Sequence, residues 1–500
     1  MTDRIPATDP AVDNPAGTTR RDTTDKIPRA VWRVAAIVAF GAFTGQLDTS
    51  VVNVGLDTVA RDLGADLAAA QWIANGYLLA LAVSLPASGW LARRYGPARL
   101  WLGALAGFTV ASGLCALAGS LGWLLALRVL QGLCAGLVVP AGLTVIGRAV
   151  GPGRLGRVMA TLGIVVTLAP ALGPTAGGLL LRLAPWPWLF WVNVPIGVAG
   201  VLLGWRYLPR DGAAGGAAGG AAGGAVGDGG GPLDGLGLML VSLGVPLLVY
   251  GCAAWGERGG LASVGATGPV ALGVLALSWF AVRSLRRAHP VLDLRLFAVP
   301  SYAAASVTSA FTSAAMFGAG LLFPLYFQLG RGEDTLATGL LLISMSIGNV
   351  VALPVTGRLV DRFGGGAVCL AGGLLSVATT VPFALLDLHT GDVLVQALLV
   401  LRGFALAAAM MPPTASAYRA VSAAQLPDAT TLVNIVLRIG GALGGALFAV
   451  VLTGALPAGT GPAFHTAFWW LSGASVLGLL GALWLTLTEL AAPRAGGTPG

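Results

Sequence analysis

The sequence consists mainly of long apolar stretches separated by short clusters of charged residues. A helix needs about 20 mostly apolar residues to cross the hydrocarbon core of a bilayer. Fourteen stretches of that kind can be read along the 500 residues, so we predict an all-α integral membrane protein. The approximate ranges are 32–55, 70–92, 99–119, 122–147, 157–181, 187–207, 234–254, 266–285, 302–329, 336–358, 367–387, 392–417, 429–454 and 464–488.

The composition excludes a soluble protein of this size. Charged residues make up 10% of the chain and hydrophobic residues 56%, with a mean hydropathy of +0.82. Ordinary globular domains carry about 25% charged residues to cover their surface. The 75 glycines show no collagen-like period, and small residues instead allow membrane helices to approach closely.

The positions of Lys and Arg predict the orientation in the membrane. With the N-terminus in the cytoplasm, 22 of the 29 basic residues fall on the cytoplasmic side, four on the other side and three at membrane depth. Cytoplasmic loops are enriched in Lys and Arg, so we expect both termini in the cytoplasm and an even number of spans. The net charge of +8 therefore reflects topology, and we expect no nucleic-acid partner. The polar start of the chain lacks a secretory signal, so we expect the first span to be an uncleaved helix.

An Ala- and Gly-rich segment near the middle of the chain cannot form a packed core and reads as a flexible linker. It separates six spans from two additional spans, which precede a further six. The predicted organisation is a polar cytoplasmic tail (1–31), a six-helix bundle (32–208), the cytoplasmic linker (209–232), two additional helices (233–286), a cytoplasmic loop (287–301), a second six-helix bundle (302–489) and a cytoplasmic tail (490–500).

An internal repeat links the two bundles. The loop after the second span reads GWLARRYGPARL (89–100), and the loop after the tenth reads GRLVDRFGGG (357–366). Both place glycines seven residues apart between the second and third helices of a bundle. A weaker similarity relates QGLCAGLVVP (131–140) to RGFALAAAMMP (402–412). Inverted or parallel repeats of this kind are typical of secondary transporters.

Six motifs, in the expected order, resemble those of the major facilitator superfamily and, within it, of the fourteen-helix drug–proton antiporters. The resemblance covers about residues 32–488. The motifs are LDTSVVNVGLDTVARDL (47–63), QWIANGYLLALA (71–82), LRVLQG (127–132), GPTAGG (173–178), WVNVPIG (191–197) and FPLYFQ (323–328).

This resemblance implies two six-helix bundles with two extra central helices, and alternating access driven by a proton gradient. It implies export of small amphipathic drugs or secondary metabolites in exchange for protons, without a cofactor. The Ala-, Gly- and Arg-rich composition suggests a bacterial source, so we expect the protein in the inner (cytoplasmic) membrane. We further expect it to be a monomer in the lipid bilayer.

The resemblance also assigns conformational roles to residues of the two loops and of the fifth span. Where the family has an aspartate in the first loop, this chain has Arg93, while the second copy keeps Asp361. The resemblance therefore does not predict which resting conformation this chain prefers. The expected conformational residues are Gly89, Arg93, Gly96, Gly173, Pro174, Gly177, Gly178, Gly357, Asp361, Arg362 and Gly364.

Ionisable residues at membrane depth are costly and are functional candidates by default. Asp48 is the one acid well inside a predicted span, and Arg128, Arg402 and Arg438 are the bases. At about 1.5 Å per residue, Asp48 lies roughly 24 Å into the first span and Arg128 roughly 9 Å from the outer end of the fourth. Both fall in the outer half of the bilayer, so we predict that they interact and couple protons to substrate. The alternative is a purely structural ion pair.

Polar and aromatic residues on the spans suit an amphipathic substrate through stacking and adaptable hydrogen bonds. Each could instead serve helix packing or interfacial anchoring. The two further arginines could donate to backbone carbonyls or to Asn and Gln side chains, or they could attract an anionic or zwitterionic substrate. The candidate cavity-lining residues are Gln46, Asn53, Asn75, Tyr77, Tyr326, Gln328, Arg402 and Arg438.

Other chemistries find little support in the sequence. The three histidines fall in loops or at span ends, the four cysteines lie singly with no metal-ligand spacing, and no phosphate-binding loop motif occurs. We therefore expect neither an enzyme nor a metal site. The alternative functions are a dedicated exporter of a lipid, peptide or anionic metabolite, and a membrane sensor that uses a transporter fold without transport.

Overall fold

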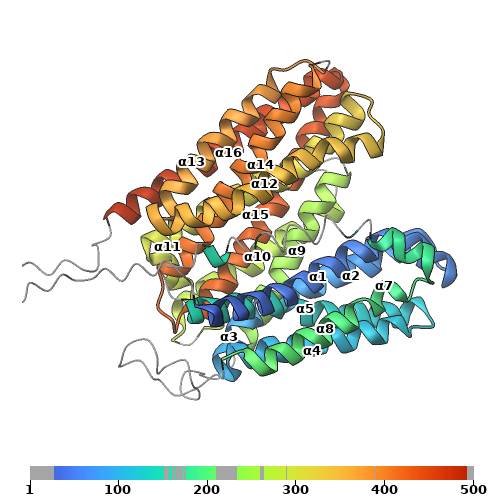
Figure 1. Cartoon of the computed structure of the whole chain (residues 1–500), viewed down its shortest axis with the longest axis vertical. Coiled ribbons are helices and arrows are strands. Elements are labelled where there is room, and N and C mark those ends of the chain that lie inside the picture. The colour runs from blue at the N-terminus through green and yellow to red at the C-terminus, as the bar shows by residue number, and fades with distance from the viewer. Residues whose placement is uncertain are drawn as a thin grey trace, which may run out of the picture.

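The computed structural model describes residues 28–150, 157–159, 163, 173, 176–209, 234–258, 264–288, 290–388 and 390–491. In these ranges the chain is helical apart from short connections (Figure 1). Most of the predicted N-terminal tail, nearly all of the linker and most of the C-terminal tail lie outside the described residues.

The first bundle is built from long helices joined by short turns. Pro86 separates the predicted second span into α2 and α3, because its ring removes one backbone donor and disfavours the helical conformation before it. The described pieces of the predicted fifth span, including residues 176–183, are helical. The elements are α1 (Arg29–Asp62), α2 (Leu67–Ser84), α3 (Ala87–Tyr95), α4 (Pro97–Ala116), α5 (Leu121–Val150), α7 (Trp188–Trp191) and α8 (Asn193–Tyr207).

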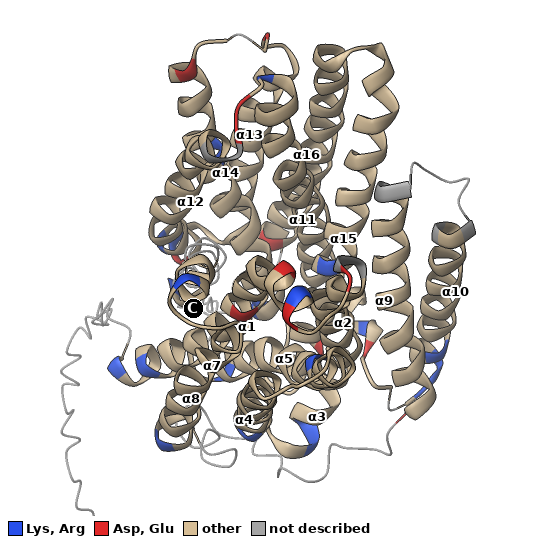
Figure 2. Ribbon diagram, turned by 90° about the vertical axis from the view of Figure 1, so that its right-hand side faces the viewer, with Lys and Arg blue, Asp and Glu red and all other residues tan. Residues whose placement is uncertain are grey.

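Two further helices, α9 (Gly235–Arg258) and α10 (Val264–Arg286), form an antiparallel pair at one side of the molecule (Figure 2). Asp234, directly before α9, forms an ion pair of 2.7 Å with Arg283 near the end of α10. The helix α9 contacts α2 of the first bundle and α15 of the second. The inserted pair therefore lies against both bundles.

The second bundle repeats the plan of the first. Its helix α15 approaches α11 closely, because Gly440 and Gly444 face the backbone of Ala310 and Ala314. The elements are η2 (Leu294–Ala298), α11 (Pro300–Leu325), η3 (Tyr326–Gly330), α12 (Thr335–Phe363), α13 (Gly365–Thr380), η4 (Val381–Ala384), α14 (Asp392–Arg419), α15 (Leu426–Ala455), η5 (Leu456–Ala458) and α16 (Thr460–Ala491).

Twelve helices of the described ranges are long and apolar enough to cross a membrane. They correspond to twelve of the fourteen predicted spans. The second predicted span is the broken pair α2 and α3, and the fifth lies largely outside the described residues. Figure 2 shows charged residues on only short parts of the ribbon, as a membrane protein requires.

The two loops of the sequence repeat have the same backbone geometry. Gly96 ends α3 and Gly364 ends α12, and each has a φ of 88°. A side chain would be strained in that conformation, so glycine is required at both turns. Each turn leads directly into the third helix of its bundle, α4 or α13.

The two bundles meet at the end of the molecule that carries these two turns, which we call the closed end. Ser88 of α3 lies 2.7 Å from Thr431 of α15, and Thr144 of α5 lies 3.0 Å from Thr430. Toward the opposite end, α1 and α2 diverge from α12 and α14 (Figure 1). The contacts at the closed end therefore hold the bundles together in this conformation.

Candidate transport site

A buried ion pair lies inside the first bundle, between α1 and α5. The guanidinium Nη1 of Arg128 is 2.6 Å from Oδ2 of Asp48, and the two side chains are 1% and 0% exposed. Asp48 and Arg128, which were expected at similar depths in the membrane, are thus in direct contact. An acid and a base sealed from solvent in this way depend on one another, because either charge alone would be very costly to bury.

Two amide side chains, one from α5 and one from a further helix, α8, complete the surroundings of the carboxylate. Asn193, at the start of α8, donates to Oδ1 of Asp48 at 2.7 Å, and Gln131 donates to the same oxygen at 3.1 Å. Arg128 donates to Gln131 at 2.7 Å, and Asn193 also donates to Ser112 of α4 at 3.2 Å. The polar network therefore joins the first, third, fourth and sixth helices of this bundle.

Two aromatic rings enclose the Arg128 guanidinium. Its Cζ lies 4.2 Å from the ring centroid of Tyr77 and 5.7 Å from that of Phe190, and both rings are buried. Cations over aromatic faces gain further stabilisation when water is excluded. The Nε of Arg128 donates to the Ile73 carbonyl at 3.0 Å, and the Tyr77 hydroxyl donates to the Gly45 carbonyl at 3.4 Å. The arginine is therefore held by α2 as well as by its acidic partner.

The network gives Asp48 two states with different consequences for helix packing. An ionised carboxylate accepts hydrogen bonds at both oxygens, whereas a protonated one loses the charge that holds Arg128. Proton binding would therefore weaken contacts among four helices. Of the described buried acids, Asp48 lies in the middle of a helix, while Asp234 and Asp428 lie at helix starts.

Of the two other arginines, Arg402 lies in the second bundle, apart from this network, whereas Arg438 interacts electrostatically with Tyr77 at its edge. Arg402 of α14 is 5% exposed and donates to the carbonyl and hydroxyl of Ser376 and to Thr380. These partners are a backbone carbonyl and hydroxyls of α13, not amide side chains. Arg438 of α15 is half-buried, and no described residue accepts a hydrogen bond from it.

The remaining candidate cavity residues have different surroundings. Gln46 and Gln328 are half-buried, and Asn53 and Asn75 are exposed. Tyr77 belongs to the network around Arg128. The structure places Tyr326 in an aromatic core instead, with ring centroids 5.5 Å from Phe468 and 5.6 Å from Phe464, because the π-helical segment η3 turns it into the bundle.

The glycine motif of the fifth span packs against α1. Gly173 faces Ser50 and Gly177 faces Val51, within three residues of Asp48. Gly173 has no room for a side chain, and a Cβ at Gly177 would lie 3.1 Å from the Val51 carbonyl oxygen. Gly178 faces open space, and Pro174 lies outside the described residues. Gly163 lies against Met411 of α14 in the other bundle. The motif thus provides close packing beside the candidate site.

The conformational residues of the two loops form ion pairs between the bundles. Arg93 of α3 pairs with Asp428 at the start of α15, and Asp361 of α12 pairs with Arg157 at 2.9 Å. Gly89 allows this approach, because a Cβ there would lie 2.7 Å from Oδ1 of Asp428. In the second loop, Cζ of Arg362 lies 5.0 Å from the ring centroid of Phe363, and Gly357 is buried.

Sequence reasoning missed four residues of these sites. Gln131 and Asn193 carry amides within apolar spans, which is a recognisable signal, whereas the hydroxyl of Ser112 is not distinctive in a span. Asp428 lies directly before the predicted span 429–454, and nothing local indicates its partner Arg93. Within the described residues, no group of three or more His, Cys, Asp or Glu side chains could hold a metal ion.

Comparisons with known proteins agree with this architecture. A family model of the Major Facilitator Superfamily matches residues 38–445 and 305–500. The chain is 32% identical over 445 residues to a multidrug resistance protein B homolog of Mycobacterium tuberculosis, covering 88% of this chain and 80% of the relative. It is 31% identical to the tetracenomycin C resistance and export protein of Streptomyces glaucescens, covering 84% and 76%.

Solved structures share the fold at low sequence identity. The human organic anion transporter MFSD10 (TETRAN) superposes with a TM-score of 0.63 at 16% identity, covering 91% of this chain and all of that one. The proton:xylose symporter XylE superposes with a TM-score of 0.60 at 13% identity, covering 90% and 95%. The chain therefore belongs to the major facilitator superfamily and is a multi-pass membrane transporter, not an enzyme.

Proposed function

We propose that this protein is a fourteen-helix exporter that exchanges protons for amphipathic drugs or secondary metabolites, with Asp48 as the proton-binding group. The observation that carries the proposal is the buried Asp48–Arg128 pair at the centre of a four-helix polar network. Relatives named for multidrug resistance and for export of tetracenomycin C support the substrate class. The alternatives, a dedicated exporter of a lipid, peptide or anionic metabolite and a non-transporting sensor, gain no support from the names of these relatives.

The proposed topology assigns the predicted fifth span and the broken pair α2 and α3 to two of the fourteen crossings. The enrichment of Lys and Arg predicts cytoplasmic termini, which would place the closed end on the cytoplasmic side of the inner membrane. In this reading the conformation is outward-facing. A transporter in that state would next accept a proton from the outer side and release its substrate there.

The proposed coupling rests on competition for one carboxylate. A proton on Asp48 removes its negative charge, which leaves Arg128 without its partner and weakens the amide contacts from α5 and α8. Because the pair is sealed from solvent in this conformation, proton exchange requires a rearrangement of these helices. The proton and the bundle motion are thereby linked.

The test is transport by purified protein in liposomes. Asp48→Asn keeps the shape of the side chain and removes its charge. We expect an imposed proton gradient to drive ethidium transport by the wild type, and transport by the variant to fall to the level of protein-free vesicles. Asp57→Asn is the matched control, since Asp57 lies on the same helix in an ion pair with Arg61 whose side chains are 66% and 73% exposed.

Substrate-driven proton movement provides the second readout. Addition of ethidium should release protons from wild-type vesicles and from Asp57→Asn vesicles, but not from Asp48→Asn vesicles. Gradient-driven transport by Asp48→Asn at the wild-type rate would refute the role of Asp48. A wild type that moves ethidium without any proton movement would refute antiport itself.

A further inference from the structure

A second polar pocket lies inside the second bundle, around Arg402. The cavity has a volume of about 30 Å³ and is enclosed by α11, α13, α14 and α16. Arg402 is the eleventh residue of α14, about 15 Å from the start of that helix, and thus deep in the membrane. The polar residues that line the cavity with it are Thr312, Ser376 and Ser475.

This pocket occupies the place that the Asp48 network occupies in the first bundle. Arg128 and Arg402 both lie on the fourth helix of their bundle, and both follow a leucine. The Asp48 network takes its other members from the first, third and sixth helices, and so does the pocket around Arg402. The two sites are therefore repeats of one arrangement.

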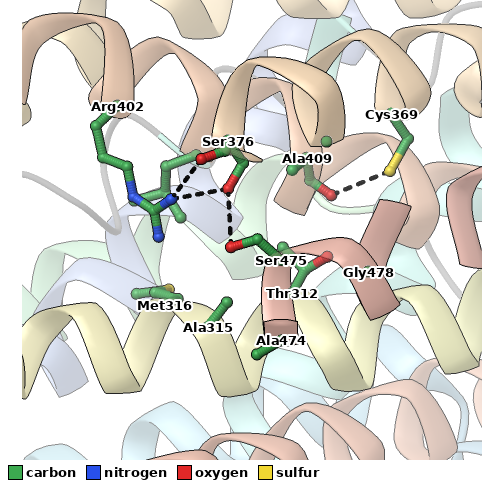
Figure 3. Close-up of a pocket in the computed structure, with 12 residues that line it drawn as sticks. Thr312, Ala315, Met316, Cys369, Ser376, Arg402, Ala409, Ala474, Ser475 and Gly478 are labelled. Carbon is green, nitrogen blue, oxygen red and sulfur yellow. Dashed lines mark hydrogen bonds between the residues drawn. The ribbon is translucent and has the colours of Figure 1, made fainter. Parts of the chain in front are cut away.

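The two sites differ in the partner of the arginine. In the first bundle the first helix provides the carboxylate of Asp48, whereas in the second bundle the first helix provides Thr312 and Met316. The described residues place no acidic side chain within ion-pair distance of Arg402, and its hydrogen bonds all come from Nη1. The guanidinium also lies beside Met316 and Ala315 of α11 (Figure 3).

Hydroxyl groups surround the remaining face of the cavity. Ser376 accepts from Arg402 at 2.9 Å and lies 3.4 Å from Ser475 of α16 (Figure 3). Hydroxyl and guanidinium groups can all donate to an anion. We infer that this pocket binds a small monovalent anion, of the size of chloride or formate, which takes the place held by the Asp48 carboxylate in the first bundle.

The cavity volume and the charge both restrict the ligand. Drug-sized pockets measure about 300–1,000 Å³, so the pocket is far too small for the transported amphipathic substrate. Buried arginines in membranes pair with acids or with backbone carbonyls, and Arg402 has carbonyl and hydroxyl partners but no described acid. An anion would supply the opposite charge, which a neutral molecule cannot. The inference is independent of proton coupling, since it concerns a different bundle and a different ion.

Thermal unfolding of the purified full-length protein in detergent tests the inference. We expect the unfolding midpoint of the wild type to be about 2–4 °C higher in sodium chloride or sodium formate than in sodium gluconate of equal ionic strength. Arg402→Met should abolish this difference. Arg438→Met is the matched control, because it removes an arginine of the same bundle outside the pocket, and it should keep the difference.

A second variant leaves Arg402 in place. Met316→Glu puts a carboxylate on α11 beside the guanidinium, which should remove the anion dependence as Asp48 does in the first bundle. A wild type whose midpoint is equal in the three salts would overturn the inference. So would a chloride effect of wild-type size in either Arg402→Met or Met316→Glu. If only formate stabilises the wild type, the ligand is a carboxylate and not a halide.

Discussion

The ion pair between Arg93 and Asp428 should control which conformation the transporter prefers. The pair joins α3 of the first bundle to the start of α15 in the second, and its side chains are 19% and 11% exposed. Arg93 also donates to the Val291 carbonyl at 3.0 Å. The ion pair requires the bundles to be together at the closed end, so its loss should favour the alternative conformation.

The size of the effect follows from the burial of the pair. Removing one partner of a fully buried ion pair costs about 3–5 kcal/mol, whereas exposed pairs contribute about 0–1 kcal/mol. For this partly exposed pair, with one further hydrogen bond retained by Arg93, we expect about 2 kcal/mol. That corresponds to a shift of about 30-fold in the ratio of the two conformations. Asp428→Asn and Arg93→Gln should each produce a shift of this order.

Distances between spin labels on the two bundles measure this ratio. Leu117 and Leu385 are 69% and 64% exposed and lie at the ends of α4 and η4 away from the closed end. Cysteines at these positions, in a protein whose four native cysteines are replaced, would report opening and closing by pulsed electron resonance. The single variants should move population from the long to the short distance.

Two further proteins make the prediction refutable. The double variant Arg93→Gln/Asp428→Asn buries no unpaired charge, so its shift should be smaller than the sum of the two single shifts. Arg61→Gln removes the exposed pair with Asp57 and should change the ratio by less than about twofold. Single variants with the wild-type distance distribution, or shifts that simply add, would show that the pair does not hold the closed end.

Two other predictions concern stability. Gly444→Leu should lower the free energy of unfolding by about 2–3 kcal/mol, because its Cβ would lie 2.5 Å from the Cα of Ala314. A Cβ at Gly445 has nothing within 4 Å, so Gly445→Leu should leave the thermal midpoint nearly unchanged. Equal midpoints of the two variants would contradict this packing. The hydrogen bond from Arg283 holds the pKa of Asp234 below its ordinary value of 3.8. The stabilisation by this pair is therefore present above about pH 4 and is lost as the pH falls through the lowered pKa. Asp234→Asn should lower the thermal midpoint at neutral pH and remove this acid sensitivity. A variant with the same acid profile as the wild type would show that the pair does not cause it.

Much of this architecture can be predicted from the sequence, because membrane helices are marked by local composition. Twelve of the fourteen predicted spans correspond to helices of suitable length and hydropathy, and the resemblance to the major facilitator superfamily is confirmed. The loop repeat placed a glycine at the same position of both loops, and Gly96 and Gly364 form turns there with the same φ. Local patterns suffice in these cases, since the hydrocarbon thickness and a positive φ each restrict the residues that can be used.

Contacts between distant segments could not be predicted in the same way. Depth along a helix placed Asp48 and Arg128 at similar levels, but it could not say which face of each helix turns toward the other. The partnership of Arg93 with Asp428 depends on how two bundles dock, which no local pattern describes. The same limit applies to Tyr326, where an aromatic residue near a span end reads equally well as a cavity residue and as part of an aromatic core.

The two bundles carry polar residues at equivalent positions, but the charges of these residues differ. This difference indicates which bundle controls the transport cycle. At the closed end the charges are exchanged: the first loop supplies the base Arg93 and the second the acid Asp361, yet both pairs join the same two bundles. Inside the bundles, among the residues that the structure describes, only the first copy has a carboxylate beside its arginine. A proton on Asp48 would therefore change the charge of the first site, whereas the described residues of the second site offer no carboxylate to receive one. If Asp48 binds the proton, the signal to open the closed end must originate in the first bundle and reach the second through the pairs that join them.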